Sequence, residues 1–179
     1  GSPIELMRLR NYAESANVEL PVSDEELERE VSVVGVLIDG KIYALSDEIL
    51  EEVASITDII FEQGVGVIFI ELFMEKNSEW LEEHYIVTVD MLKEILKKAR
   101  PQYYLGQNII TVAEKISEHD AIVKEILRVS KGSSVVIFSE LVEVLEYIPS
   151  EKIAWSLSMS PEFVWISEGK YFCMKDFII

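Results

Sequence analysis

The chain has 179 residues, 49% of them hydrophobic, with 33 acidic against 16 basic side chains and a formal net charge of −17. This composition supplies enough apolar residues for buried cores and so excludes global disorder. Because duplex DNA is a dense anionic rod, so acidic a chain requires a local basic patch to contact it.

Two helices and a hairpin are the first predicted elements. Residues 4–16 have apolar side chains at mixed i+3 and i+4 spacing, which predicts a short helix. Ser23 is the predicted N-cap of a second helix, whose first turn is rich in acidic residues that the helix dipole favours. The Asp-Gly pair at 39–40 predicts a type I′ turn between strands at about 33–38 and 41–45.

A second group of elements begins with a predicted helix over 47–62, whose apolar residues form one stripe. The phrase VIFIEL at 67–72 predicts a short extended piece and then the start of another helix. Thr88 is the predicted cap of a third helix over 89–99. A second hairpin is expected to turn at 106–108.

The last group repeats this order after a short polar link. A helix is predicted over 120–129, and Ser139 is the predicted cap of the next one. Pro149-Ser150 is expected to start a third helix, because proline is favoured at helix starts. The final hairpin is predicted to turn at 168–169, where a Glu-Gly pair lies between apolar runs.

One phrase recurs along the chain and sets the register of these groups. VIFIEL at 67–72 returns as VIFSEL at 136–141, and PIEL at 3–6 is a fainter copy. We expect Phe69 and Phe138, which this alignment superposes, to pack in the cores. The recurrence predicts one supersecondary unit used three times, here called the first, middle and last repeats.

The order helix, short strand, helix, capped helix and hairpin is that of a winged helix–turn–helix. Together with the F-x-EL phrase and GKYF at 169–172, it resembles tandem winged-helix proteins. The resemblance is loosely to the helix–turn–helix module of the bacterial RNA polymerase delta subunit and of some restriction and chromatin proteins. It implies an α+β, helix-dominant fold, with three helices and a β-hairpin wing in each complete repeat, the first being partial. The predicted domains are 1–46, 47–113 and 118–179.

The first repeat lacks its opening helix, because IEL at 4–6 aligns with IEL at 70–72. Two interpretations stay open. The sequence either begins inside a repeat, as a piece of a longer protein, or opens with a two-helix arm packed on the middle repeat.

The third helix of a DNA-binding winged helix enters the major groove, and the wing touches phosphates or the minor groove. In the middle repeat this helix is the one basic stretch of the chain, whereas the corresponding DEELERE of the first repeat would repel phosphate. The alternative is a solvated helix face, with lysines near the C-terminus where the dipole favours cations. The candidate nucleic-acid contacts are Lys93, Lys97, Lys98, Arg100 and Gln107.

Winged helices that do not read DNA commonly bind protein with the same faces. Trp155 and Trp165 are candidate interface anchors if they are exposed, since tryptophan is enriched at binding hot spots. Lys152, on the same predicted helix as Trp155, is a further candidate. The alternative is that both tryptophans pack in the core between repeats.

Nothing in the sequence predicts catalysis, a cofactor or a metal site. His84 and His119 have no partner at metal-ligand spacing, no phosphate-binding glycine motif is present, and no Ser-His-Asp set can be nominated. The single cysteine, Cys173, excludes an internal disulfide. No apolar run reaches the roughly 18 residues of a membrane span, so no membrane contact is expected and the expected location is the cytoplasm.

The sequence therefore favours a non-catalytic interaction module of a larger intracellular protein, with a protein partner in a nucleic-acid-related context. DNA binding through the helix over 89–99 is the alternative, and the net charge disfavours it.

Overall fold

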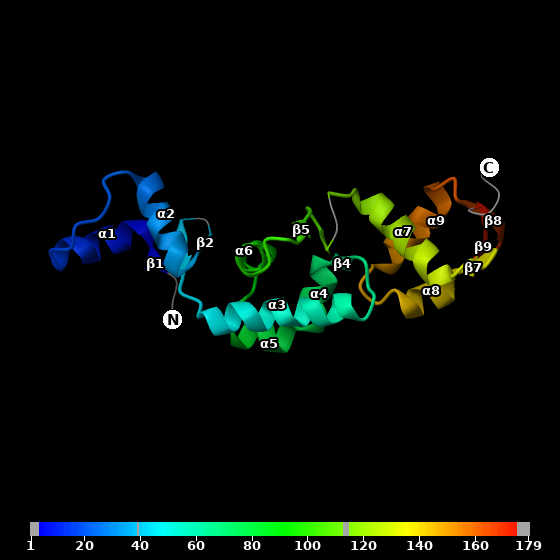
Figure 1. Cartoon of the computed structure of the whole chain (residues 1–179), viewed down its shortest axis with the longest axis horizontal. Coiled ribbons are helices and arrows are strands. Elements are labelled where there is room, and N and C mark those ends of the chain that lie inside the picture. The colour runs from blue at the N-terminus through cyan, green and yellow to red at the C-terminus, as the bar shows by residue number, and fades with distance from the viewer. Residues whose placement is uncertain (1–3, 39, 113–114, 175–179) are drawn as a thin grey trace. The chain divides into compact units, whose positions relative to one another are not determined.

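The computed structural model describes residues 4–38, 40–112 and 115–174 (Figure 1). Helices predominate, and the strands form small antiparallel sheets, so the predicted helix-dominant α+β class is confirmed. The contacts divide the chain into two compact units. The N-terminal compact unit comprises Gly1–Thr57 with Trp80–Pro101, and the C-terminal compact unit comprises Asp58–Glu79 with Gln102–Ile179. This division falls inside two helices, those over 47–62 and 78–83.

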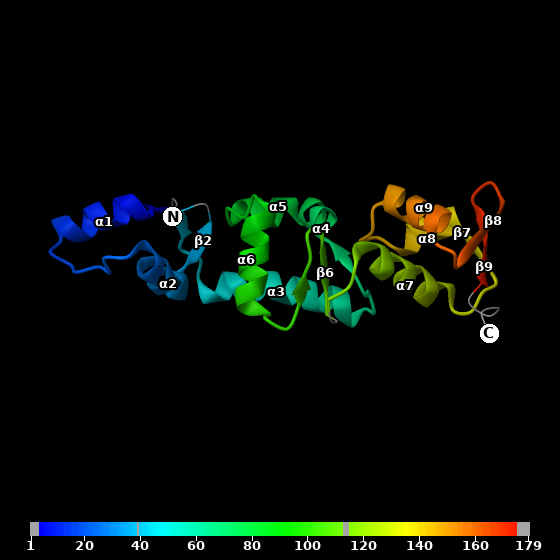
Figure 2. The ribbon, with the colours of Figure 1, turned by 90° about the horizontal axis from the view of Figure 1, so that it is seen from above.

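Three sheets share one topology. Their strand orders are β1-β3-β2, β4-β6-β5 and β7-β9-β8, and each joins an isolated strand to the second strand of a hairpin. Figure 2 shows the last hairpin, with β8 and β9 side by side. The same order of strand, helices and hairpin therefore occurs three times in the described part of the chain.

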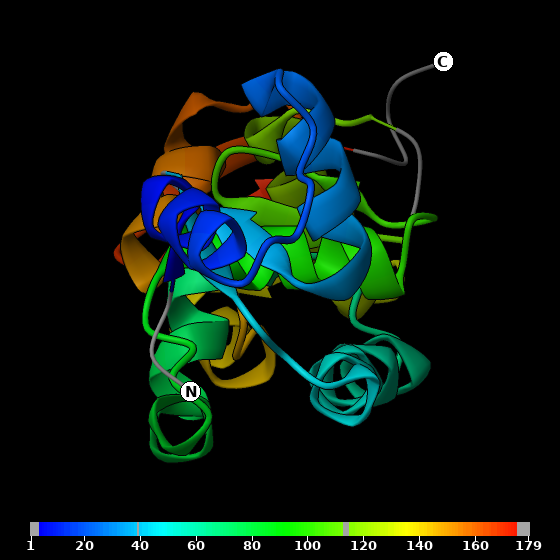
Figure 3. The same ribbon diagram turned by 90° about the vertical axis from the view of Figure 1, so that its left-hand side faces the viewer.

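The elements have the following bounds. The first repeat contains β1 (Ile4–Glu5), α1 (Leu6–Ser15), α2 (Asp24–Val34), β2 (Val36–Ile38) and β3 (Lys41–Tyr43), and its α1 and α2 face the viewer in Figure 3. The middle repeat contains α3 (Asp47–Glu62), β4 (Ile68–Phe69), α4 (Ile70–Lys76), α5 (Ser78–Glu83), α6 (Val89–Ala99), β5 (Tyr104–Leu105) and β6 (Ile109–Thr111). The last repeat contains α7 (Glu118–Ser130), β7 (Val135–Ile137), α8 (Phe138–Val144), α9 (Ser150–Met159), β8 (Phe163–Ser167) and β9 (Lys170–Cys173).

Local capping signals placed several helix starts correctly. The hydroxyl of Ser23 accepts a hydrogen bond from the Glu26 N–H at 3.4 Å, and that of Thr88 accepts one from the Met91 N–H at 3.2 Å. Each bond satisfies a donor that the first helical turn would otherwise leave unpaired. The predicted helices 47–62 and 89–99 have the observed bounds of α3 and α6.

Other predicted boundaries were wrong. Ser139 is not a cap, because α8 begins one residue earlier, at Phe138, directly after β7. The helix predicted from 120 begins at Glu118, since Ser117 accepts a hydrogen bond from the Asp120 N–H at 3.1 Å. The helix predicted over 4–16 begins only at Leu6, because residues 4 and 5 form β1, and it ends at Ser15.

The first hairpin is also shorter than predicted. Residues 33 and 34 belong to α2, whose hydrogen-bond ladder continues from Gly35 N–H to the Val31 carbonyl at 3.0 Å. The strands of this hairpin are β2 and β3, which cover 36–38 and 41–43, whereas the predicted strands covered 33–38 and 41–45. Asp39 lies outside the described residues, whereas Gly40 has the positive φ of 71° that such a turn requires.

Equivalent hydrogen bonds fix the register between the repeats. In each one, the N–H of the first residue after the isolated strand donates to the carbonyl of the residue before the last hairpin strand. These pairs are Leu6 with Gly40 at 3.2 Å, Ile70 with Asn108 at 2.9 Å, and Phe138 with Gly169 at 2.8 Å.

This register corrects the alignment based on the recurring phrase. Structurally Phe69 matches Ile137, each being the last strand residue before a helix, whereas the phrase matches Phe69 with Phe138. Likewise Leu6 matches Ile70, so the IEL alignment is two residues out. Phe69 is buried in the core, but Phe138 is only half-buried against it.

The C-terminal compact unit has a core to which both the middle and the last repeats contribute. Val67, Phe69 and Ile109 pack in one cluster with residues of α7, α8 and α9. The Phe69 N–H also donates to the Tyr147 carbonyl at 2.9 Å, which joins β4 to the segment between α8 and α9. The two repeats therefore share their hydrophobic interior at this point.

Buried hydrophobic residues of the N-terminal compact unit come from α1, α2, β2, α3, α5 and α6, and from the segment between α5 and α6. They are Ala13, Leu27, Val31, Val36, Leu50, Val53, Ala54, Leu81, Ile86, Met91, Leu92, Ile95 and Leu96.

Candidate interaction surfaces

The basic residues of α6 are partly used within the protein. The ammonium of Lys98 donates to the carbonyls of Ser32 at 3.0 Å, Val33 at 3.3 Å and Gly35 at 3.4 Å. These carbonyls lie at the C-terminal end of α2, where helix carbonyls lack intrahelical partners and a cation is favoured by the dipole. Lys98 therefore caps a neighbouring helix.

Arg100, just after α6, forms a two-pronged ion pair with Glu51 of α3. Its Nη1 and Nη2 donate to the two carboxylate oxygens at 3.1 and 3.0 Å, and its side chain is only 17% exposed. Such paired geometry holds a guanidinium firmly. Arg100 is therefore neutralised where the sequence predicted a phosphate contact.

The other three candidate contacts lie on α6 and in the second hairpin. Lys97 is exposed and lies 3.8 Å from Glu94, and Lys93 is half-buried on the same helix. Gln107 is exposed in the turn between β5 and β6, and it belongs to the C-terminal compact unit. The structure thus places four of the five predicted residues on or next to α6, where acidic side chains and helix carbonyls offset much of their charge.

The exposed face of α9 has a different character. Trp155 is 52% exposed and Met159, one turn later, is 62% exposed. The Trp155 ring meets the His119 ring edge-on, with centroids 5.1 Å apart. Trp155 is therefore held against α7 while more than half of its surface remains accessible, so it is not a core residue.

Lys152 is held by a small polar network between α7 and α9. Its ammonium lies 2.5 Å from Oε1 of Glu118, and Nδ2 of Asn108 donates to Oε2 at 2.9 Å. Partial burial alone would raise the pKa of Glu118, but the hydrogen bonds from Lys152 and Asn108 lower it below its ordinary value. Glu118 is therefore ionised at neutral pH, and the charge of Lys152 is matched.

A groove of about 560 Å³ adjoins this network. Its walls come from the start of α7 and from α9, and its floor includes the fully buried Ile122. This volume falls in the range of ordinary ligand pockets. Its lining includes Glu118, His119, Ile122, Glu151, Lys152 and Trp155.

The second predicted anchor, Trp165, lies in β8 and is 65% exposed. Trp165 pairs with Tyr171 of β9. Its neighbour Val164 pairs with Phe172 of β9, which pairs on its other side with Val135 of β7. Val164 and Val135 are also exposed. The sheet of the last repeat therefore carries accessible apolar side chains, as does α9.

Sequence reasoning missed a buried ion pair in α7. Glu125 is only 3% exposed, and Arg128 donates to its two oxygens at 2.9 and 2.8 Å. The hydrogen bond to Glu125 raises the pKa of Arg128. A Cβ placed on Gly66 would collide with the Glu125 carboxylate, so the glycine lets the two segments approach. An E-x-x-R spacing is common on exposed helices and gave no signal of burial.

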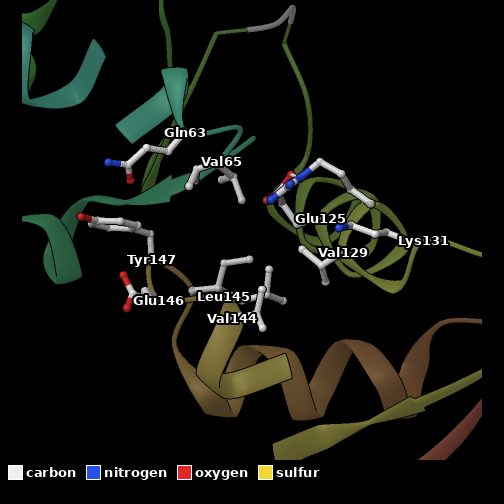
Figure 4. Close-up of a pocket in the computed structure, with 12 residues that line it drawn as sticks. Gln63, Val65, Glu125, Val129, Lys131, Val144, Leu145, Glu146 and Tyr147 are labelled. Carbon is white, nitrogen blue, oxygen red and sulfur yellow. Dashed lines mark hydrogen bonds and ion pairs between the residues drawn. The ribbon is translucent and has the colours of Figure 1, made fainter. Parts of the chain in front are cut away.

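This pair borders a cavity of about 460 Å³ (Figure 4). Figure 4 shows Val65, Val129, Val144 and Leu145 around the space at the centre of the view, and Tyr147 at the side away from α7. Burial, together with the neighbouring Glu146 charge, raises the pKa of Tyr147. Aliphatic side chains make up half of the cavity lining and polar or charged ones most of the rest, and its ion pair is internally satisfied.

Both histidines make structural contacts. His84 lies 2.8 Å from the Trp80 carbonyl through Nδ1 and stacks on the Trp80 ring, and His119 lies 3.0 Å from Ser160 Oγ through Nε2. Among the residues that the structure describes, no group of three or more His, Cys, Asp or Glu side chains is arranged to hold a metal ion. Within residues 4–38, 40–112 and 115–174, no helix has the length and hydropathy needed to cross a membrane.

Comparison with known proteins gave no match to any protein-family model and no significant match to a curated protein.

Proposed function

We propose that the chain is a non-catalytic interaction module of tandem winged-helix repeats, and that it binds a protein rather than DNA. The repeated strand order and the equivalent hydrogen bonds to each hairpin turn support the winged-helix assignment. In this assignment the third helices are α2, α6 and α9. The host is an intracellular protein that works in a nucleic-acid-related context.

The exposed face of α9 carries this proposal. Trp155 and Met159 follow one another at i, i+4, so they lie on the same side of the helix. The one basic residue of α9, Lys152, is already paired with Glu118. A helix that reads DNA needs cations for phosphates and polar groups for base edges, whereas an exposed tryptophan beside a groove suits a protein partner.

DNA binding through α6 is the second candidate, and the exposed ammonium of Lys97 favours it. Two features oppose it. Lys98 and Arg100 are engaged with α2 and Glu51, and the net charge of −17 repels a polyanion at long range.

The test combines DNA titration with site-directed photo-crosslinking. Fluorescence anisotropy with a labelled duplex at low salt is expected to show no binding. Salt-sensitive binding that Lys93→Glu and Lys97→Glu abolish would establish the DNA function instead. Lys98 and Arg100 are left unchanged, because substitution would remove their contacts with α2 and Glu51. A photo-crosslinker at position 155 is expected to capture a partner protein in cells, and one at the exposed Tyr12 is the matched control.

A further inference from the structure

We infer that the groove between α7 and α9 receives a basic amphipathic helix of the partner protein. This inference rests on the proposed function and adds the chemical class of the partner. It follows from the shape of the groove, from the apolar strip beside it, and from the charge of the surface around it.

The shape and lining of the groove fit apolar anchors from a helix. Ile122 provides an apolar floor, Trp155 stands at one wall, and Met159 extends the apolar strip by one turn along α9. A helix that lies in such a groove presents side chains at i, i+3, i+4 and i+7. A volume of about 560 Å³ accommodates two or three of them.

Charge selects a cationic partner. Glu118 and Lys152 neutralise each other at the groove edge, which leaves the exposed Glu151 as the uncompensated charge of the lining. The whole chain adds a field from its excess of 17 negative charges. Lysine or arginine on the polar face of a docking helix would be attracted by both the local and the overall charge.

The same charge argues against a second copy of this chain as occupant. Two molecules that each carry −17 repel one another. A partner of opposite charge meets no such repulsion.

The test titrates the full chain with synthetic peptides in a calorimeter. The probe is an amphipathic helix of about 14 residues, or four turns, with leucines on one face and lysines elsewhere. One control peptide has the same composition scrambled, so that its leucines share no face, and another replaces every lysine with glutamate. The amphipathic Leu/Lys peptide is expected to bind about tenfold or more tightly than either control.

Matched variants locate the binding. Trp155→Ala is expected to weaken binding of the Leu/Lys peptide by about thirtyfold, whereas Tyr12→Ala, at an even more exposed aromatic of the N-terminal compact unit, leaves binding unchanged. Glu151→Lys is expected to weaken it severalfold more than Glu52→Lys, which changes the net charge equally. Circular dichroism of each variant checks that the fold is intact.

Several results would overturn the inference. If the peptide with glutamate in place of lysine bound as tightly as the Leu/Lys peptide, and Trp155→Ala weakened both, α9 would remain the protein-binding face. A basic partner would then be rejected. Peptide binding that neither Trp155→Ala nor Glu151→Lys alters, or no binding of any peptide, would reject the groove as the docking site. Displacement of the peptide by duplex DNA, or self-association that Trp155→Ala removes, would assign the face to another occupant.

Discussion

Replacing Gly66 with alanine is expected to destabilise the C-terminal compact unit by about 2–4 kcal/mol. The new Cβ would lie 3.0 Å from the Glu125 Cδ and closer still to one carboxylate oxygen, so the carboxylate must move. Glu125 is 3% exposed and is held by two hydrogen bonds from Arg128. Overpacking alone costs about 1–3 kcal/mol, and breaking a buried ion pair costs about 3–5 kcal/mol.

The assay is urea unfolding followed by circular dichroism, in a double-mutant cycle with Glu125→Ala. Once the carboxylate is removed, alanine at position 66 meets no obstacle, and its cost should fall below about 0.5 kcal/mol. Gly66 does not have a positive φ, so no backbone strain should remain. The control is Gly132→Ala, where φ is +78° and no atom lies within 4 Å of the new Cβ.

Gly132→Ala should cost about 1–2 kcal/mol through left-handed backbone strain, equally with and without Glu125. The reasoning would be refuted if Gly66→Ala matched the parent in stability, or if its cost were the same in both backgrounds. Either result would mean that the Glu125 carboxylate does not limit the space at Gly66.

Three further predictions concern other contacts. Thr88→Ala should lower stability by about 1 kcal/mol through loss of the N-cap of α6, and Thr88→Ser should restore most of it, as measured by urea unfolding. Lys98→Met should cost about 0.5–1 kcal/mol because α2 loses its cation, whereas Lys97→Met should stay within about 0.5 kcal/mol of the parent; equal effects would contradict the capping role. Because the pKa of Glu118 is lowered on folding, its ionised form contributes stability that is complete above the ordinary value of 4.5 and is lost as pH falls below it. Thermal unfolding at several pH values should therefore show a deficit for Glu118→Gln at neutral pH that shrinks below pH 4.5, with the exposed Glu48→Gln as control.

Elements with local signals were predicted well. Thr88 and the Glu-Gly pair at 168–169 mark a helix start and a turn through the chemistry of neighbouring residues, and both lie where expected. Ser139 shows where such reasoning fails. Its sequence suits an N-cap, but α8 already begins at Phe138, the residue before it. The Phe138 N–H donates to the carbonyl of Gly169, a residue distant in the chain.

The candidate surfaces divide in the same way. The exposure of Trp155 and Trp165 agrees with their selection as candidate anchors. The role of Lys98 could not be predicted, because the carbonyls it binds lie 63 to 66 residues away in the chain. The number of basic residues on one helix overstates the positive charge available to a partner when some of them are bound to neighbouring helices, as Lys98 and Arg100 are.

The core shared by the middle and last repeats bears on how this protein can be divided. Val67, Phe69 and Ile109 contribute to the same interior as α7, α8 and α9. A truncation at the sequence boundary near 113–118 would leave this interior open to water on both sides of the cut. Recombination between homologous genes would therefore preserve this interior only if no crossover fell between the segment that holds Val67 and Phe69 and the end of the last repeat.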